Sequence, residues 1–294
     1  MSRVVVRAYA KINLSLEVLG KRPDGYHAVR TVMQSVDISD QLVMERAEGL
    51  SLECDRGDLS GEENLVLRAA RALGEATGVD GGAKIRLSKG IPVAAGLGGA
   101  SADAAAALVG LCRLWGIECS PDDLLCLAST LGSDVSFFLI GGTALASGRG
   151  EEVSPLPDAP AVWVVLLVPS HSLAGKTAEM YRRLSPDAWT DGRTTNRLVE
   201  SILDGCLPPE DLLRNCFDPF ADAVFPELPL LRRAMLEAGA AGAHLSGAGP
   251  ALFALFADEM SALSSAARLR SLGHRPLVAR TLGSAEARPY PLVI

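Results

Sequence analysis

The sequence has no long hydrophobic run, and this absence argues against a membrane-spanning helix. Its longest strongly apolar segment, AVWVVLLV, covers only residues 161–168, whereas about 20 apolar residues are needed to cross a bilayer. The N-terminal residues MSRVVVRAYAKINL also lack the apolar core and cleavage site of a signal peptide. We therefore expect a cytoplasmic protein without a membrane partner.

Cysteine and basic residues are also scarce. The six cysteines form no C-x-x-C pair, which predicts reduced thiols in place of a metal site. The 28 Lys and Arg residues are outnumbered by 35 Asp and Glu residues, giving a net charge of −7. This balance disfavours a nucleic-acid-binding protein, which usually carries a basic patch. The chain of 294 residues, 48% of them hydrophobic, is long enough for two globular domains.

The first half of the chain alternates predicted strands and helices. Apolar and polar residues alternate from Val4 to Leu19, which predicts a half-buried strand, and GKRPDG (20–25) predicts a turn. Three further alternating segments, 29–36, 41–47 and 50–54, suggest a meander of separate strands. Next we expect a helix capped by Asn64, a strand over 83–88, a helix capped by Ser101 that ends at Gly116, and a helix capped by Ser120.

Prolines cluster in SPLPDAP (154–160), and we place a domain boundary there, dividing residues 1–158 from 159–294. The second part predicts a strand over 161–168, helices within 175–238, a strand pair in 244–256, a helix from about 259 to 272 and a strand in 276–280. This β-α-β-β-α-β order matches a ferredoxin-like domain with extra helices inserted.

The segment IPVAAGLGGASADAAAAL (91–108) contains Gly96, Gly98 and Gly99 directly before an alanine-rich stretch. Glycine permits left-handed backbone and a close approach by another molecule, and alanine favours a helix. Unpaired N–H groups and the positive helix end would then meet at one point, which suits an anion. The pattern G-x-G-G is neither a dinucleotide fingerprint nor a Walker A motif. On composition alone, a plain glycine turn before a helix explains it equally well.

A second segment competes for the role of phosphate site. In PSHSLAGKTAEMY (169–181), the tripeptide Gly175-Lys176-Thr177 precedes a helical pattern and resembles the end of a Walker A motif. The strand ending at Asp258 could then supply an acidic magnesium ligand. The first glycine of that motif would fall at position 170, which is Ser170. This departure disfavours a P-loop and leaves it as the lesser alternative.

Three segments together resemble the motifs of the kinase superfamily that includes galactokinase, homoserine kinase and mevalonate kinase (the GHMP kinases). They are AYAKINLSLEVLGKRPDGYHAVRTVMQSVDISD (8–40), the glycine segment 91–108, and HLSGAGPALFALF (244–256). AKINL and RPDGYH resemble one branch in particular, as do LGSDVSFFL (131–139) and NCFDPFADAVFPEL (215–228). That branch phosphorylates the 2-hydroxyl of a cytidine diphosphate-linked methylerythritol in the non-mevalonate isoprenoid pathway.

This resemblance implies an α+β fold with a ribosomal-protein-like N-terminal βαβ domain, a ferredoxin-like C-terminal domain and an active site between them. It also implies ATP and Mg²⁺ as cofactors and a small-molecule substrate, and we expect a monomer or a weak homodimer. The other possibilities are a mevalonate-type kinase, a nucleic-acid-binding module and a non-catalytic relative of the kinases.

The resemblance also implies which residues bind ATP. The triphosphate would be wrapped by Pro92, Val93, Ala94, Ala95, Gly96, Leu97, Gly98, Gly99, Ala100, Ser101 and Ala102, and the adenine pocket would include Asn64, Leu65 and Lys89. Ala100 replaces a glycine of the family, and Ala102 and Ala248 stand where serine is common. The hydroxyl contact to Mg²⁺ or phosphate therefore rests on Ser101.

For the reaction itself, the resemblance implies that Lys11 lies near the transferring phosphoryl group and that Asp134 accepts the hydroxyl proton. From the residues alone, a solvated strand lysine is the better explanation of Lys11, and a helix cap is the plain explanation of Asp134. Asn13 lies two residues after Lys11, so both side chains face one side of the strand. The acceptor would be bound by Asn13, Tyr26, His27, Thr177 and Tyr181, with the base between the two tyrosines.

Overall fold

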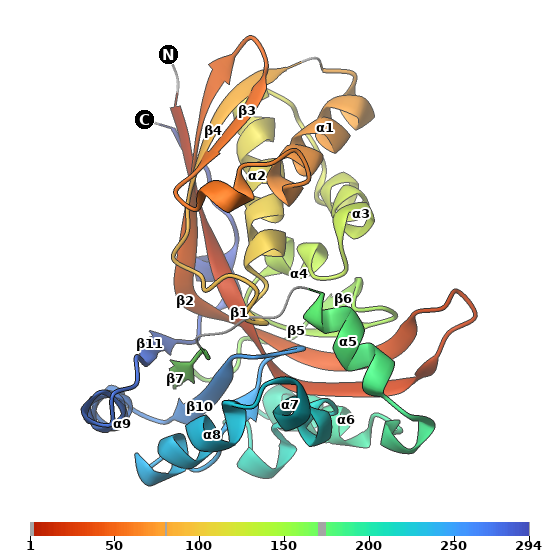
Figure 1. Cartoon of the computed structure of the whole chain (residues 1–294). Helices are drawn as coiled ribbons and strands as arrows, with labels where there is room; N and C mark the ends of the chain where they lie inside the picture. The colour runs from red at the N-terminus through yellow and green to blue at the C-terminus, as the bar shows by residue number, and fades with distance from the viewer. Residues whose placement is uncertain (1–2, 80, 170–174, 294) are drawn as a thin grey trace.

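Two β-sheets organise the chain in the computed structural model (Figure 1), which describes residues 3–79, 81–169 and 175–293. The larger sheet is built on the long antiparallel pair β1 (Arg3–Lys21) and β2 (His27–Ala47). Its strand order is β12-β1-β2-β4-β3, with β5 also on β2, β6 on β5 and β8 on β1. The other strands are β3 (Leu50–Cys54), β4 (Gly82–Ser88), β5 (Thr143–Ser147), β6 (Glu152–Pro155), β8 (Arg214–Asn215) and β12 (Leu292–Val293).

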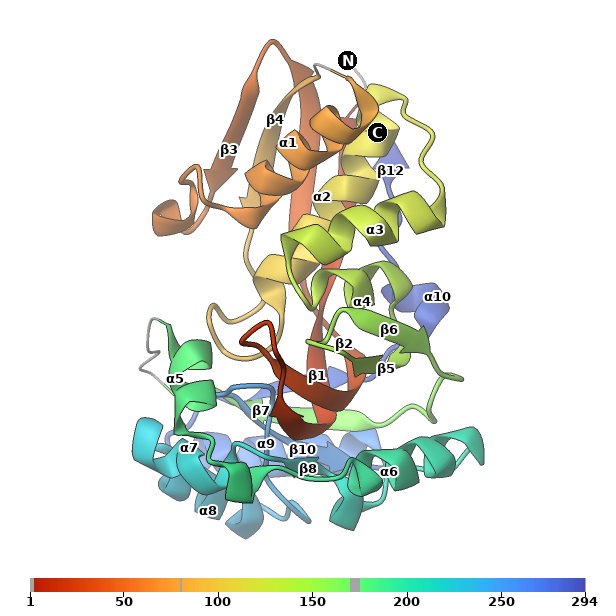
Figure 2. The same ribbon diagram turned by 90° about the vertical axis from the view of Figure 1, so that its right-hand side faces the viewer.

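The predicted meander is wrong in one respect, because segments 29–36 and 41–47 belong to the single strand β2. The pairing of β1 with β2 shifts register between Tyr9 and Ala10, between Asn13 and Ser15, and between Val18 and Gly20. Such bulges bend a strand without ending it, so one long hairpin takes the place of several short strands. In Figures 1 and 2 this hairpin extends past the first layer and reaches the second sheet.

Helices cover one face of the larger sheet (Figures 1 and 2): α1 (Leu65–Thr77), α2 (Gly99–Trp115), α3 (Pro121–Leu131) and α4 (Val135–Ile140). The alanines of α2 at positions 104–107 are completely buried. A Cβ atom added at Gly110 would collide with the Met44 methyl group and lie 3.0 Å from Val6. Small residues therefore let α2 lie directly on β1 and β2.

The helix ends follow the sequence with one exception. Asn64 caps α1 by accepting the Val66 N–H at 2.8 Å, and Ser120 forms a capping box with Asp123. The expected cap of α2 at Ser101 is wrong, because α2 begins at Gly99 and its N-cap is Gly98, with φ of 76°. A left-handed glycine turns the chain into the helix earlier than a serine cap would. No side chain then caps the N–H groups of the first turn.

The smaller sheet has the order β11-β7-β10-β9, built from β7 (Trp163–Leu167), β9 (His244–Leu245), β10 (Leu252–Phe256) and β11 (Leu277–Arg280). This is the strand order of the ferredoxin-like fold that the sequence predicted. The remaining helices are α5 (Lys176–Arg183), α6 (Arg193–Leu203), α7 (Asp218–Val224), α8 (Leu228–Glu237), α9 (Glu259–Ser271) and α10 (Ser284–Ala287). Short 3₁₀ turns lie at Gly57–Leu59, Pro186–Ala188 and Glu210–Leu212.

The second half of the chain contributes to the first sheet as well, through β8 and β12, which both pair with β1. The division at residue 158 stays a prediction. All six cysteines are free thiols, as expected. Within the described ranges, no helix is long and apolar enough to cross a bilayer.

The packing of α2 generates a first prediction. Ala106 lies one turn before Gly110 on the helix face that meets the sheet. Ala106→Leu overpacks this contact, and we expect a loss of about 1–3 kcal/mol in the free energy of unfolding, measured by urea denaturation. Ala76→Leu, on the exposed end of α1, is the matched control and should leave stability nearly unchanged. Equal effects in the two variants would contradict the close approach of α2.

Candidate active site

The loop between β4 and α2 is shaped by three residues with left-handed backbone, namely Ala94 (φ 52°), Gly96 (φ 88°) and Gly98 (φ 76°). A Cβ atom on Gly96 would collide with the Ser246 carbonyl oxygen. A Cβ atom on Gly98 would lie 2.5 Å from the Phe138 ring and 3.1 Å from Cγ of Lys11. The two glycines are therefore required by backbone angle and by space.

Backbone hydrogen bonds from both sheets hold this loop. The Lys11 N–H donates to the Leu97 carbonyl at 3.0 Å, and the Ala251 N–H donates to the Ala95 carbonyl at 2.9 Å. The loop's carbonyl oxygens are thus directed into the scaffold. The N–H groups in the first turn of α2 lack intrahelical partners, as at any helix start, and carry the positive end of the helix dipole. A helix start of this kind suits an anion.

Lys11 is a buried lysine, 3% exposed, so the alternative of a solvated strand lysine is wrong. Its ammonium donates to Oδ1 of Asn13 at 2.5 Å and to the Gly96 carbonyl at 3.2 Å, and it lies 3.6 Å from Oδ2 of Asp134. Lys11 and Asn13 share one face of β1, as the i, i+2 spacing predicted. The ammonium therefore connects the glycine loop with the carboxylate of Asp134.

The neighbours of Lys11 are oriented by their own contacts. Asp134 is the N-cap of α4, but its side chain makes no capping hydrogen bond, so the carboxylate is left to Lys11. The Asn13 amide donates to the Thr31 hydroxyl at 2.8 Å, and that hydroxyl donates to the Ser15 carbonyl at 2.5 Å. This chain fixes the Asn13 amide with its oxygen towards Lys11.

These groups line one cavity of about 490 Å³ between the two sheets. Its wall contains most of the predicted site residues: Lys11, Asn13, Asn64, Leu65, Lys89, residues 92–101, Asp134, Thr177 and Tyr181. Ala102, Tyr26 and His27 are not part of this wall. The Ala102 side chain is buried in α2, and its N–H donates to the Gly98 carbonyl at 2.9 Å.

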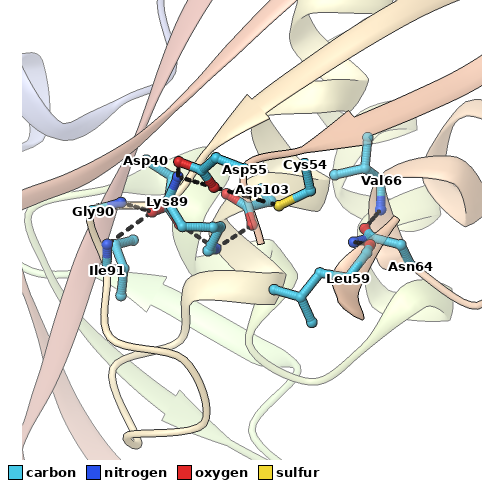
Figure 3. Close-up of polar contacts among 10 residues, drawn as sticks. All are labelled: Asp40, Cys54, Asp55, Leu59, Asn64, Val66, Lys89, Gly90, Ile91 and Asp103. Carbon is cyan, nitrogen blue, oxygen red and sulfur yellow. Dashed lines mark hydrogen bonds and ion pairs between the residues drawn. The ribbon is translucent and has the colours of Figure 1, made fainter. Parts of the chain in front are cut away.

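Lys89 belongs to a buried ion cluster beside the cavity (Figure 3). Its ammonium donates to the carboxylate of Asp40 and to Oδ2 of Asp103, the latter at 2.6 Å. The other oxygen of Asp40 accepts the N–H groups of Gly90 and Ile91 at 2.7 and 2.8 Å. The Lys89 ammonium is thus engaged within the protein, where it anchors the start of the glycine loop to β2 and α2.

One ammonium balances two carboxylates in this cluster. Burial, reinforced by the charge of Asp40, raises the pKa of Asp103 to about 8, although Lys89 acts against the shift. Burial alone would lower the pKa of Lys89, but Asp103 and Asp40 raise it above its ordinary value. Oδ1 of Asp103 is buried without a hydrogen-bond partner among the described residues. Asp103 is therefore the incompletely hydrogen-bonded carboxylate of the cluster, whereas both oxygens of Asp40 accept hydrogen bonds.

Aromatic rings close the acceptor side. His27 stacks on Tyr181 with centroids 5.0 Å apart and planes at 24°, and Tyr181 meets Phe217 edge-on at 5.0 Å. Tyr26 is more than half exposed, and its ring is covered by the Arg149 guanidinium at 4.9 Å. The structure thus brings His27 and Tyr181 together, while Tyr26 pairs with Arg149.

The rival phosphate motif contributes to the same cavity. Lys176 and Thr177 begin α5 after the left-handed Gly175 and line the wall, while residues 170–174 lie outside the described part of the chain. Asp258 caps α9 by accepting the Ser261 N–H at 2.9 Å, so it serves a helix end in place of a metal.

Four charged residues of the cavity wall were not predicted as site residues, namely Glu63, Asp103, Arg149 and Lys176. Asp103 could have been noticed as the single acid within an otherwise apolar helix face. Lys176 was weighed only as a P-loop lysine, and nothing in its neighbourhood marks Arg149.

Comparison with known proteins agrees with this geometry. The models of the GHMP kinase N-terminal and C-terminal domains match residues 64–142 and 208–275. A 4-diphosphocytidyl-2-C-methyl-D-erythritol kinase of Pelotomaculum thermopropionicum is 47% identical over 95% of this chain and 98% of its own length. The chain belongs to the 4-diphosphocytidyl-2-C-methyl-D-erythritol kinase family. The enzyme of that name from Dehalococcoides mccartyi is 43% identical over 94% of this chain and 97% of its own length.

Solved structures extend the comparison to the fold. A 4-(cytidine 5'-diphospho)-2C-methyl-D-erythritol kinase superposes with a TM-score of 0.80 at 36% identity, covering 96% of this chain and all of that one. A homoserine kinase from Cytophaga hutchinsonii has a TM-score of 0.77 at 22% identity over 99% of this chain and 97% of its own, and shares the fold. The two-domain GHMP kinase fold and an ATP-dependent kinase activity, both expected from the sequence, are thereby confirmed.

The ion cluster generates a second prediction. Because the Asp103 carboxyl has a pKa of about 8 in the native state and about 3.9 when unfolded, the native state holds the extra proton between these values. The free energy of unfolding of this kinase should therefore fall as pH rises from 5 to 8, by up to about 1.4 kcal/mol per pH unit. Asp103→Asn should remove this slope in urea titrations at the two pH values.

Asp40→Asn is the matched variant of the same cluster. This variant leaves Lys89 with Asp103 as its one remaining carboxylate partner in the cluster and weakens the hydrogen bonds from the Gly90 and Ile91 N–H groups. We expect a loss of about 3–5 kcal/mol, as for other broken buried ion pairs. Parallel pH slopes in the wild type and Asp103→Asn would contradict the assignment of the titrating group.

Proposed function

We propose that this kinase transfers the γ-phosphoryl group of ATP to the 2-hydroxyl of 4-diphosphocytidyl-2-C-methyl-D-erythritol. The supporting observation is the Lys11–Asp134 pair, which lies in one cavity with the glycine loop and is bonded to it through the Gly96 carbonyl. The family of the chain supports the acceptor's identity. The reaction is a step of the non-mevalonate isoprenoid pathway.

The triphosphate of ATP is held by residues 92–101, which line the cavity, whereas Ala102 is buried in α2. Phosphoryl transfer needs positioning and charge stabilisation more than covalent help, and backbone N–H groups at a helix start provide both. Asn64 and Leu65, at the start of α1, line the same cavity, which supports their assignment to the adenine pocket. Lys89 contributes by anchoring the loop, because its ammonium is already paired with Asp40 and Asp103.

The transfer itself uses Lys11 and Asp134. The acceptor hydroxyl oxygen forms a bond to the γ-phosphorus while the bond from that phosphorus to the leaving oxygen of ADP breaks. Asp134 accepts the hydrogen bond of the hydroxyl and then its proton, and the Lys11 ammonium, 3.6 Å away, holds the carboxylate in position. The fixed Lys11 ammonium also stabilises the negative charge that develops on the transferring group.

Mg²⁺ fits this site through Ser101. The ion is usually held by substrate phosphates, waters and one or two protein oxygens. Ser101 lies in the first turn of α2 and lines the cavity, and its hydroxyl makes no hydrogen bond to another described residue. When bound, the ion neutralises charge on the phosphates. The remaining work of orienting both substrates belongs to the protein groups named above.

The acceptor binds through Asn13, Thr177 and Tyr181 on the cavity wall, and through Tyr26 and His27 beyond that wall. Asn13 lies beside Lys11 at the reacting hydroxyl. The stacked rings of His27 and Tyr181 offer a flat surface and a ring nitrogen for a cytosine base. A mevalonate-type acceptor has no base and would leave this aromatic surface without a use.

The catalytic pair generates a third prediction. We expect Lys11→Met and Asp134→Asn each to lower kcat by on the order of 10²–10⁴, because each removes one preorganised group at the reacting atoms. Lys84→Met changes a lysine that pairs with Glu53 outside the cavity and should leave kcat unchanged. Steady-state measurement of ADP release checks all three. Near-normal turnover in both site variants would rule out the pair.

The acceptor's base generates a fourth prediction. Tyr181→Ala should raise the KM for the acceptor by about 5- to 150-fold, the equivalent of losing 1–3 kcal/mol of stacking, with little change for ATP. Tyr181→Phe retains the ring and should behave nearly as the wild type. Methylerythritol phosphate without the cytidine should be a very poor substrate. Equal efficiency with both acceptors would leave a GHMP kinase with a different substrate.

A further inference from the structure

Lys176 is a buried cation that the reaction described above does not use. It is the first residue of α5, only 7% exposed, and its side chain lines the cavity that contains Lys11 and Asp134. Its ammonium nitrogen has no hydrogen-bond partner within the described part of the chain. Buried ammonium groups are normally paired because desolvation is costly, so this one lacks its counter-ion.

Among the described residues, no carboxylate interacts with the Lys176 ammonium. Asp134, on the cavity wall, is paired with Lys11. On α7, which packs against α5, Asp218 and Asp222 both face Arg232. The charged group that does act on Lys176 is Lys11 from β1, and it acts by repulsion. Two buried ammonium groups thus share one cavity wall.

Two cations facing one cavity form a site for a group with more than one negative charge. The substrates of this kinase supply two such groups, the triphosphate of ATP and the diphosphate of the acceptor. The ATP triphosphate already has the N–H groups of the glycine loop and α2. Lys176 instead belongs to the helix that carries Thr177 and Tyr181, two residues assigned above to the acceptor.

Along α5, Lys176 lies away from the aromatic rings that are proposed to bind the cytosine base of the acceptor. Figures 1 and 2 show α5 starting beside the glycine loop and running away from it. Tyr181, with His27 stacked on it, follows five residues later, about 7.5 Å further along the helix axis. A cation at the start of α5 thus has Lys11 as its charged neighbour and the aromatic surface further along its own helix. In the acceptor, the diphosphate likewise lies between the reacting sugar alcohol and the cytidine.

We propose that the Lys176 ammonium binds the diphosphate of the acceptor, opposite Lys11. This inference rests on the proposed function, because the acceptor's diphosphate comes from it. The lysine is kept unpaired and buried in the free enzyme, and the substrate supplies the missing charge. Lys176 is thus a binding residue for the acceptor and not a P-loop lysine for ATP.

A pH effect follows from the same arrangement. Burial, with repulsion from Lys11, lowers the pKa of Lys176 to about 7 in the free enzyme. A bound diphosphate favours the charged form and raises this pKa again, so acceptor binding above pH 7 takes up a proton. Affinity for the acceptor should therefore be highest below pH 7 and fall as pH rises above it.

The test compares Lys176→Met with the wild type and with Lys84→Met as a matched control. We expect the KM for the acceptor to rise about 10- to 100-fold, as for loss of a hydrogen bond to a charged group, with the KM for ATP unchanged. The melting temperature should stay the same or rise, because Met removes an unpaired buried charge. A lysine with a purely structural role would lower the melting temperature and leave KM unchanged.

Binding of two inert probes provides a readout without catalysis. Calorimetric titration at pH 8 with cytidine and with cytidine diphosphate should show a preference for the diphosphate that Lys176→Met loses about 10-fold or more. Proton uptake on binding cytidine diphosphate, obtained from two buffers of different ionisation enthalpy, should also decrease. An unchanged preference, or a rise in KM for ATP instead, would overturn the proposal. Failure of the wild-type enzyme to phosphorylate the acceptor would reject the proposed function itself.

Discussion

The site depends on the close contact between the glycine loop and β1. A backbone hydrogen bond joins Lys11 to Leu97, and Gly98 leaves no Cβ in the space filled by the Lys11 stem and Phe138. The same residue thus fixes the loop with its backbone and faces the reaction centre with its side chain. In the proposed reaction, different elements hold the nucleotide and the acceptor, so this contact would set the distance between the phosphoryl group and the hydroxyl that receives it.

Local patterns predicted most elements because they depend on neighbours in the sequence. The alternation of apolar and polar residues located β1, and the capping residues Asn64 and Ser120 marked the starts of α1 and α3. The succession of elements in the second half predicted a ferredoxin-like fold, whose strand order the smaller sheet has. The i, i+2 spacing of Lys11 and Asn13 was sufficient to place both on one face, where they form a hydrogen bond. The chemistry assigned to them came from the family resemblance, since composition alone describes an ordinary strand.

Features that depend on packing between distant segments could not be predicted in this way. The sequence around Lys89 does not indicate that its ammonium pairs with Asp40, 49 residues away, and with Asp103, 14 residues away. The predicted start of α2 was wrong because Gly98, with left-handed backbone, is the N-cap in place of Ser101. Phe138 and Lys11 leave no room for a side chain at position 98. His27 stacks on Tyr181 only because the hairpin bends towards α5. In each case the deciding partner is remote in sequence.

The bulged hairpin of β1 and β2 has a consequence for how acceptor preference can change. Lys11 lies between two register shifts and pairs with Ser35, whereas His27 pairs with Lys21 at the far end, beyond the last shift. The GKRPDG turn connects the strands on the side of His27. A change in the length of this turn would act on the end of the hairpin that carries His27, the ring proposed to meet the base, and leave the pairing of Lys11 with Ser35 in place. In the proposed reaction, turn length could therefore adjust the span between the recognised base and the reacting hydroxyl without changing the residues that transfer the phosphoryl group.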